Sequence, residues 1–116
     1  MKSNSTVKPP TLHNLGNGYW YYNFNIIDGK IADESGKMQP SFFYDQVKIT
    51  GTPTYEKCVR AVIRSLYDES KEFSLINKYN AFSLGISTNE ADKAEYEAYL
   101  RAVIAIKNMV KKDLQV

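Results

Sequence analysis

The spacing of apolar residues in the first half of the chain predicts two long strands. The sequence YWYYNFNII at 19–27 alternates, so that successive side chains face opposite sides. One face carries Trp20, Tyr22, Phe24 and Ile26, and the other carries Tyr19, Tyr21, Asn23, Asn25 and Ile27. Asp28-Gly29 is a strong turn signal, so we expect a short return strand from residue 30 and a loop at 33–37. Residues 41–50 alternate again and predict a second long strand, antiparallel to the first.

The second half of the chain shows apolar stripes at helical spacing. Thr54 caps a first helix, whose stripe consists of Cys58, Val59, Val62, Ile63, Leu66 and Tyr67. A second helix is predicted from about 70 to 81, with its inward side chains at Phe73, Leu75, Ile76 and Tyr79. Ser87-Thr-Asn-Glu90 fits a capping box before a third helix at about 89 to 113. Since this helix is longer than a small sheet can cover, we expect its end to project and to pair with another chain.

These elements predict an α+β fold, with an N-terminal antiparallel hairpin or small sheet followed by three helices. A sheet of two or three strands is marginal alone, so the helices are expected to pack on one of its faces. Residues 1–17 are rich in Ser, Asn, Pro, Lys and Gly, and Pro9-Pro10 prevents a helix there. We therefore expect a flexible N-terminal arm at 1–17 and a single α+β domain at 18–116.

Composition and charge exclude several classes of partner. The chain of 116 residues has 43% hydrophobic and 24% charged residues, as is usual for one globular domain. Its net charge of +2 is too small to argue for nucleic acid, which needs a clustered basic surface. No apolar run follows Lys2 as in a secretory signal, and no window approaches the roughly 20 apolar residues of a membrane span. We therefore expect a cytoplasmic protein, or one carried out of the cytoplasm inside a larger particle, with no nucleic-acid or membrane partner.

The residues that most often carry chemistry are few and scattered. The single cysteine, Cys58, lies on the apolar stripe of the first helix, where packing is its expected role. The single histidine, His13, lies in the predicted arm, and one Cys with one His would need two carboxylates to make a zinc site. Asp28, Asp33 and Glu34 do not have the spacing of an EF-hand loop. The sequence therefore predicts no enzyme, no metal and no cofactor.

The aromatic strand is the strongest functional candidate, and three interpretations of it are open. A sheet packed on helices uses one aromatic face for its core. The tyrosines of the other face suit a protein interface, where Tyr and Trp are enriched. They also suit a stacked sugar, because their neighbours are Asn and Asp rather than the Lys and Arg of nucleic-acid binders. Tyr19, Tyr21 and Asn23 are therefore the candidates for contact with a partner or a ligand.

Three segments also carry a family resemblance: YYNFNI at 21–26, YEKCVRAVIRSLYDESKEFSLINKYNA at 55–81 and EYEAYLRAVIAIKNMV at 95–110. Together they resemble small prophage-encoded proteins of gut anaerobes, and they are similar to phage tail-associated and tail-fibre assembly proteins. The shared motifs are structural, so the resemblance implies no catalytic residue. It implies contacts with other phage or tail proteins, or with further copies of the chain, and incorporation into a virion.

The leading hypothesis is a non-enzymatic, phage-derived protein that acts in tail assembly or structure through protein–protein contacts. Its predicted contact residues are Tyr19, Tyr21 and Asn23 on the strand, with Arg101 and Lys107 on the last helix. The alternative is a module that binds a glycan or another small ligand on the aromatic strand face. A third hypothesis, a helical regulator or adaptor of a host protein, also stays open.

Overall fold

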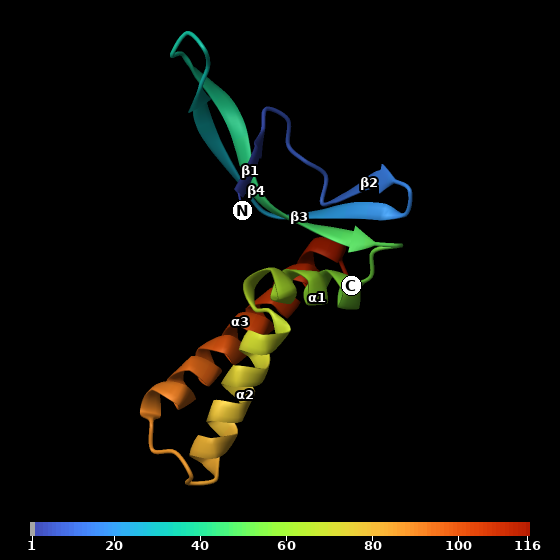
Figure 1. The fold of residues 1–116 in the computed structure, drawn as a ribbon. Helices are drawn as coiled ribbons and strands as arrows, with labels where there is room; N and C mark the ends of the chain where they lie inside the picture. Colours follow the sequence, from blue (N-terminus) through green and yellow to red (C-terminus); the bar gives the residue numbers. More distant parts are fainter. Residues whose placement is uncertain (1) are drawn as a thin grey trace.

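The structure is a computed structural model that describes residues 2–116 of the chain. A four-stranded antiparallel sheet precedes three helices, which confirms the predicted α+β fold class (Figure 1). The elements are β1 (Lys2–Ser5), β2 (Leu12–Gly16), β3 (Tyr19–Ala32), β4 (Met38–Thr50), α1 (Tyr55–Leu66), α2 (Glu69–Ser83) and α3 (Glu90–Leu114). The order of strands in the sheet is β1-β4-β3-β2, so the two long strands lie at its centre.

The two long strands form one hairpin that runs past the predicted turn. Asp28 pairs with Phe42 and Gly29 pairs with Ser41, well inside the β3–β4 ladder. The prediction of a turn at Asp28-Gly29 with a short return strand is therefore wrong. The chain reverses at 33–37, the segment that was predicted to be a loop.

Side-chain contacts explain where the chain does and does not turn. The Asp33 carboxylate accepts hydrogen bonds from the backbone N–H groups of Ser35 and Lys37, both at 2.9 Å, and so closes the reversal. Gly29 is instead covered by an aromatic ring of the neighbouring strand. A Cβ at Gly29 would lie 2.3 Å from the Phe43 ring, so there is no room for a side chain here. The need for glycine at this position therefore comes from packing and not from a turn.

A β-bulge divides β3 into two parts. The register shifts between Phe24 and Ile27, where two residues of β3 oppose one residue of β4. Asn25 lies in this bulge with φ of 52°, a left-handed conformation that Asn adopts more readily than most residues. The extra residue reverses the alternation, so that Ile27 rather than Ile26 shares the face of Phe24. The predicted faces are therefore correct up to Phe24 and wrong beyond it.

The N-terminal segment, predicted to be a flexible arm, supplies both outer strands of the sheet. β1 pairs with β4 and β2 pairs with β3, while Met1 of the predicted arm lies outside the described residues. Pro9-Pro10 lies in the crossing between the two strands, where Asn23 N–H donates to Thr11 O at 2.8 Å. The hairpin has two edges of backbone donors and acceptors, and this segment pairs part of each edge. Residues 2–17 therefore belong to the same sheet as the rest of the domain.

The main hydrophobic core lies between the inner face of the sheet, α1 and the C-terminal half of α3. Its buried side chains are Tyr22, Phe24, Ile49, Cys58, Val59, Val62, Ile106 and Val110. Thr54 caps α1 as predicted, since its hydroxyl accepts a hydrogen bond from Lys57 N–H at 3.2 Å. The predicted stripe of α1 is confirmed in its first two turns, whereas Leu66 at its end is exposed.

The other end of the molecule is a helical hairpin made by α2 and the N-terminal half of α3 (Figure 1). Asp68 caps α2, and Asn89 rather than Ser87 caps α3. Phe73 was predicted to face inward but is exposed. The half of α3 that extends beyond the sheet is its N-terminal half, and α2 of the same chain packs along it. The pairing of this half with another chain stays a prediction.

The molecule is elongated because these two parts extend in different directions (Figure 1). Its Cα radius of gyration is 18.3 Å and its principal extents are 60 × 36 × 23 Å. A compact chain of this length would have a radius of gyration of about 13 Å. The distal β3–β4 hairpin and the α2–α3 hairpin therefore both project from the core, where other molecules can reach them.

Candidate functional site

Two of the predicted contact residues lie together on the outer face of the sheet. Tyr19 is exposed, and the Lys48 Nζ lies 4.2 Å from the centroid of its ring. Tyr21 is half-buried and packs edge-on against His13, with ring centroids 6.4 Å apart. This small surface joins two tyrosines to a cation, so it can take part in a contact but offers no enclosed site.

The third predicted residue of that strand, Asn23, is not available to a partner. Its side chain is 1% exposed. Its Nδ2 donates to Pro10 O at 2.8 Å, and its Oδ1 accepts from Gln46 Nε2 at 2.8 Å. Asn23 therefore fixes the crossing between β1 and β2 to the sheet, and this internal role corrects its assignment as a contact residue.

The two predicted residues of the last helix do not join the tyrosines. Arg101 and Lys107 are exposed on α3, which packs behind the inner face of the sheet, whereas Tyr19 and Tyr21 are on the outer face. Arg101 forms an i,i+4 ion pair with Glu97 at 3.8 Å. Lys107 follows Arg101 by six positions along the helix, which places their side chains about 120° apart around its axis. The five predicted residues therefore do not form one site.

A different surface stands out at the end of the α2–α3 hairpin, which we call the hairpin tip (residues 82–89). The loop closes α2 with two backbone hydrogen bonds: Ile86 N–H donates to Ala81 O at 2.9 Å, and Gly85 N–H donates to Phe82 O at 3.0 Å. Gly85 has φ of 76°, so the loop is a Schellman motif with glycine at its left-handed position. This bonding gives the hairpin tip a defined conformation.

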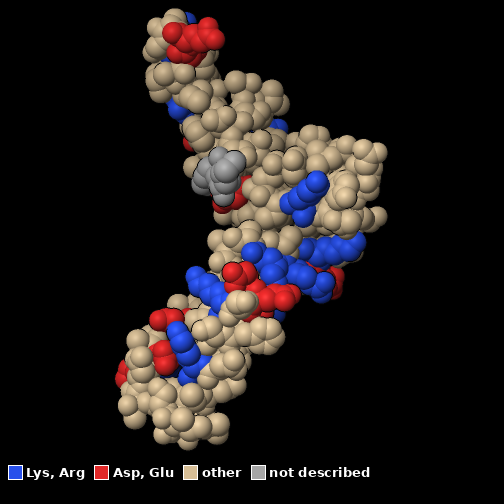
Figure 2. Space-filling model, viewed as in Figure 1, with Lys and Arg blue, Asp and Glu red and all other residues tan. Residues whose placement is uncertain are grey.

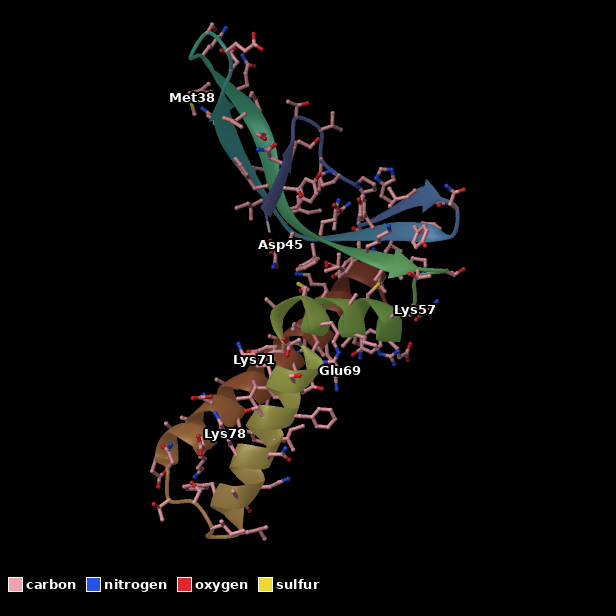
Figure 3. All side chains as sticks on the ribbon, viewed as in Figure 1. Met38, Asp45, Lys57, Glu69, Lys71 and Lys78 are labelled. Atoms are coloured by element: carbon pink, nitrogen blue, oxygen red, sulfur yellow. The ribbon has the colours of Figure 1, made fainter. Side chains whose placement is uncertain are left out.

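The hairpin tip is apolar and uncharged. Leu84 is 75% exposed and Ile86 is 78% exposed, the highest exposures among the large hydrophobic residues that the structure describes. No charged residue lies between Lys78 and Glu90. Figure 2 shows this end of the molecule free of Lys, Arg, Asp and Glu on the visible face, and Figure 3 shows Lys78 above it on α2. An ordered loop that exposes two large aliphatic side chains is a typical protein-contact surface.

Stacked tyrosines hold the two helices of this hairpin together. The rings of Tyr79 and Tyr96 stack with centroids 4.4 Å apart, and Tyr96 stacks on Tyr99 at 6.2 Å. Tyr67 then meets Tyr99 edge-on at 5.1 Å. Leu75 is the buried aliphatic residue of α2. The hairpin therefore depends on aromatic contacts rather than on a large aliphatic core.

A polar contact fixes the base of the hairpin. The Tyr99 hydroxyl donates a hydrogen bond to the Glu72 carboxylate, and Arg64 forms an ion pair with the same carboxylate at 3.2 Å. The bond from Tyr99, followed by that from Arg64, lowers the pKa of Glu72. Burial and the bond to Glu72 raise the pKa of Tyr99 to about 12. One carboxylate thus connects α1, α2 and α3.

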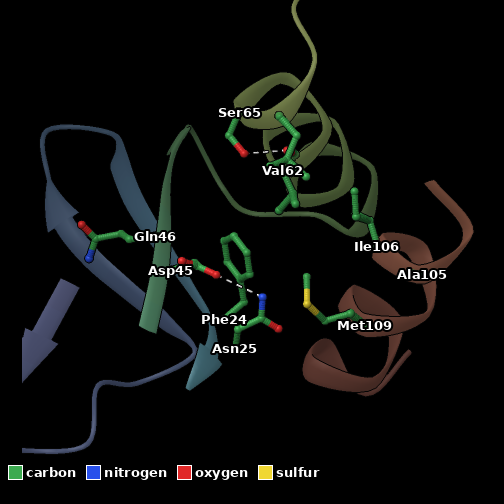
Figure 4. A pocket seen from close by; sticks show the side chains of 10 residues that line it. Phe24, Asn25, Asp45, Gln46, Val62, Ser65, Ala105, Ile106 and Met109 are labelled. Carbon is green, nitrogen blue, oxygen red and sulfur yellow. Dashed lines mark hydrogen bonds between the residues drawn. The ribbon is translucent and has the colours of Figure 1, made fainter. Parts of the chain in front are cut away.

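A cleft opens between the bulge of β3 and the helices (Figure 4). Its volume is about 450 Å³, within the range of small-molecule sites. Phe24 and Met109 provide apolar walls, and Asn25 Nδ2 donates to Asp45 Oδ2 at 3.1 Å at its polar side. The bulge points Asn25 toward this cleft, as bulges near functional sites often re-aim a side chain. We call this feature the bulge cleft.

Two further reactive groups, the Cys58 thiol and the Tyr22 hydroxyl, belong to buried residues. Burial raises the pKa of the Cys58 thiol, so its reactive thiolate is disfavoured. The Tyr22 hydroxyl donates to Asp113 Oδ2 at 2.6 Å, and burial, followed by this bond, raises the pKa of Tyr22. Residues 2–116 contain no group of three or more His, Cys, Asp or Glu side chains placed to hold a metal ion. In the same range, no helix combines the length and the apolar composition that crossing a membrane requires.

Sequence reasoning missed both the hairpin tip and the bulge cleft. The hairpin tip had a signal, since the sequence from Tyr79 to Asn89 has no charge and carries Leu84 and Ile86 beside Gly85. The bulge cleft had none, because alternation of residue types continues through Asn25 and does not reveal the extra residue.

No protein-family model matches this chain, and no curated protein or solved structure matches it either. The resemblance to prophage-encoded tail proteins therefore stays a prediction that rests on the quoted segments.

Proposed function

We propose that this chain is a non-enzymatic protein that acts through protein–protein contacts, with the hairpin tip as its main contact surface. The observation that carries the proposal is the exposure of Leu84 and Ile86 on an ordered, uncharged loop. Water contact with two large aliphatic side chains is unfavourable, and a partner that covers them removes this apolar surface from water. Because backbone hydrogen bonds already order the loop, binding loses less conformational entropy than it would with a flexible segment.

The sides of the α2–α3 hairpin and its length support the same proposal. Phe73 on α2 and Leu100 and Ile104 on α3 are also exposed, so the hairpin carries further apolar side chains between the hairpin tip and the core. The hairpin holds this surface away from the sheet (Figure 1). A partner can therefore cover it without contacting the rest of the molecule.

The resemblance of the sequence to prophage-encoded proteins supplies the class of partner. We propose a phage tail protein as the partner, and tail assembly or structure as the process. Tyr19 and Tyr21 on the outer sheet face, and Arg101 and Lys107 on α3, are secondary contacts in this proposal.

Partner capture with matched variants tests the proposal. Full-length protein, the double variant Leu84→Ser/Ile86→Ser and the control Val7→Ser are each immobilised and exposed to a lysate of phage-producing cells. Val7 is similarly exposed but lies in the crossing between β1 and β2, far from the hairpin tip. We expect the parent and the control to capture the same virion protein, and the double variant to bind it at least about tenfold more weakly. Equal capture by the double variant would contradict the role of the hairpin tip, and a partner that is not a virion protein would contradict the tail assignment.

A second candidate function is the binding of a small ligand in the bulge cleft, favoured by its volume of about 450 Å³. The alternative hypothesis from the sequence was a ligand on the tyrosines of the outer sheet face. The bulge cleft instead lies on the inner face of the sheet, beside Phe24 and Met109. A ligand-observed NMR screen of saccharides and other small neutral molecules tests this function, with Met109→Trp as a variant that fills the cleft. Binding that the variant abolishes supports the function, and the absence of binding across the panel argues against it.

A further inference from the structure

The distal half of β3 has an open edge. β2 pairs with β3 only from Tyr19 to Tyr22, whereas β4 pairs with β3 as far as Ala32. Within residues 2–116, no strand lies on the second side of β3 from Ile27 onward. In Figure 1 this part of the hairpin projects beyond the helices, and Figure 3 marks its far end with Met38. Open edges of this kind are templates for pairing with another strand.

The backbone direction along this edge follows from the end of the hairpin. Asp33 N–H donates to Lys37 O across the reversal at 2.8 Å. Since backbone groups point alternately to the two sides of a strand, the groups of Ile27, Gly29 and Ile31 also point at β4. The N–H and C=O groups of Asp28 and Lys30 therefore point to the open side.

The sequence of this edge is complementary to itself. From the structure we infer that two copies of the chain pair through their β3 edges, antiparallel, about a two-fold axis at Gly29. In this register Asp28 lies opposite Lys30 of the second copy, and Lys30 lies opposite Asp28. Ile27 and Ile31 oppose one another in the same way. The segment Ile27-Asp-Gly-Lys-Ile31 therefore meets its own reverse with opposite charges paired and with isoleucine facing isoleucine.

The backbone and the side chains agree on this register. The residues whose backbone groups point outward, Asp28 and Lys30, become the hydrogen-bonded pairs, with Cα atoms about 5.5 Å apart across the axis. Their side chains are exposed and of opposite sign. The axis passes through Gly29, where the absence of a side chain lets the Phe43 ring of each copy lie close to the interface.

The apolar side chains explain why pairing is favourable. Ile27 is 54% exposed and Ile31 is 40% exposed. Both lie on the face of the sheet that carries Phe43, since Ile27 pairs directly with Phe43. Pairing places the isoleucines of the two copies side by side next to two Phe43 rings, which removes apolar surface from water. The contact is isologous, so it closes as a dimer in which four strands from each copy form one sheet.

This contact does not involve the hairpin tip and is independent of the proposed function. The paired segment is short, so the interface falls at the small end of specific protein contacts, and we expect a dimer that dissociates on dilution.

Charge reversal provides the test. Analytical ultracentrifugation of full-length protein over a wide concentration range should show a monomer–dimer equilibrium. Asp28→Lys alone places Lys opposite Lys, and Lys30→Asp alone places Asp opposite Asp, so each variant should dimerise about tenfold more weakly. An equimolar mixture of the two variants restores opposite charges at both positions, and dimerisation should return. Circular dichroism of each variant checks that the fold is unchanged.

Hydrogen exchange then locates the contact. The amides of Asp28 and Lys30 should become protected at high protein concentration and lose protection on dilution. The amides of Gly29 and Ile31, which face β4 in the same strand, serve as internal controls and should stay protected throughout. Three results would overturn the inference: a monomer at every concentration, a dimer that neither single charge reversal weakens, or a dimer in which the amides of Asp28 and Lys30 exchange as fast as in the monomer.

Discussion

The two ends of this molecule are built from different contacts. Around the sheet, aliphatic and aromatic side chains from β3, β4, α1 and α3 form one buried cluster that includes Val62 and Val110. In the α2–α3 hairpin, Leu75 and Tyr99 are the buried residues, and stacked tyrosines with one shared carboxylate supply most of the contacts. Since burial of apolar surface is the main source of stability, the cluster around the sheet is expected to determine global folding. The hairpin is expected to open locally at lower free energy.

The core around the sheet and the α2–α3 hairpin also have different roles. The core fixes the position of the C-terminal half of α3, and the hairpin extends the other half away from it. The most exposed aliphatic side chains of the chain are at the far end of the hairpin, not near the core. A region with modest internal packing thus displays the apolar surface that we assign to partner binding.

Truncation of the core should have the largest effect on stability. Ile106 on α3 is buried in the main cluster, whereas Ile104 on the same helix is exposed. We expect Ile106→Ala to lower the free energy of unfolding by about 2–5 kcal/mol, because it removes buried methyl groups and leaves a cavity. Ile104→Ala should change it by less than about 0.5 kcal/mol. Urea unfolding measures both, and equal effects would contradict the assignment of the core.

Loss of the polar contact at the base of the hairpin should have a smaller and local effect. Tyr99→Phe keeps the ring but removes the hydroxyl that bonds Glu72. We expect the free energy of local opening of the α2–α3 hairpin to fall by about 1–2 kcal/mol. Hydrogen exchange in α2 should then be faster, with little change in α1. Tyr96→Phe is the control, since Tyr96 contributes ring stacking to the same cluster. A uniform loss of protection across the molecule would mean that the hairpin does not open independently.

Acid should open the hairpin before it unfolds the core. The bond from Tyr99 and the ion pair with Arg64 hold the pKa of Glu72 below its usual value. This contact therefore stabilises the hairpin fully above the usual carboxyl pKa of about 4.3, and the stabilisation is lost as the pH falls through the lowered value. An NMR titration from neutral to acidic pH should show the α2 signals changing before those of α1. Glu72→Gln should bring the pH values at which the α2 and α1 signals change closer together. If both sets of signals change at the same pH in the unmodified protein, the assigned role of Glu72 is wrong.

Substitution of the hairpin tip should have the smallest effect on stability. Leu84→Ser/Ile86→Ser removes side chains that are already in water, so we expect the free energy of unfolding, measured in urea, to stay within about 0.5 kcal/mol of the parent. A large destabilisation would show that these side chains support the hairpin, and would weaken the argument that they are displayed for a partner.

The sequence alone predicted those elements whose patterns lie within one continuous segment. The stripe and cap of α1 lie within one segment, so the helix was predicted with its N-cap at Thr54. The two long strands also followed from alternation of residue types. The α+β order of elements could therefore be predicted without any tertiary information.

The missed features depend on contacts between distant residues. Asp28-Gly29 has the composition of a turn, but Phe43 of the neighbouring strand occupies the space beside Gly29. The bulge at Asn25 follows from pairing with β4 and leaves no mark in the alternation. The polar composition of the N-terminal segment predicted an arm, although its backbone pairs with both edges of the β3–β4 hairpin. The predicted contact residues were dispersed for the same reason, since Asn23 became a buried anchor for that segment.

Native-state hydrogen exchange in low concentrations of urea tests most directly whether the molecule has a folding core and a separable hairpin. The amides of α1, β3 and β4 should exchange only through global unfolding, with one common free energy. The amides of α2 should exchange through a local opening of lower free energy and weaker urea dependence. If the amides of α2 instead exchange with the same free energy and urea dependence as those of α1, the two regions unfold as one unit and the division proposed here is wrong.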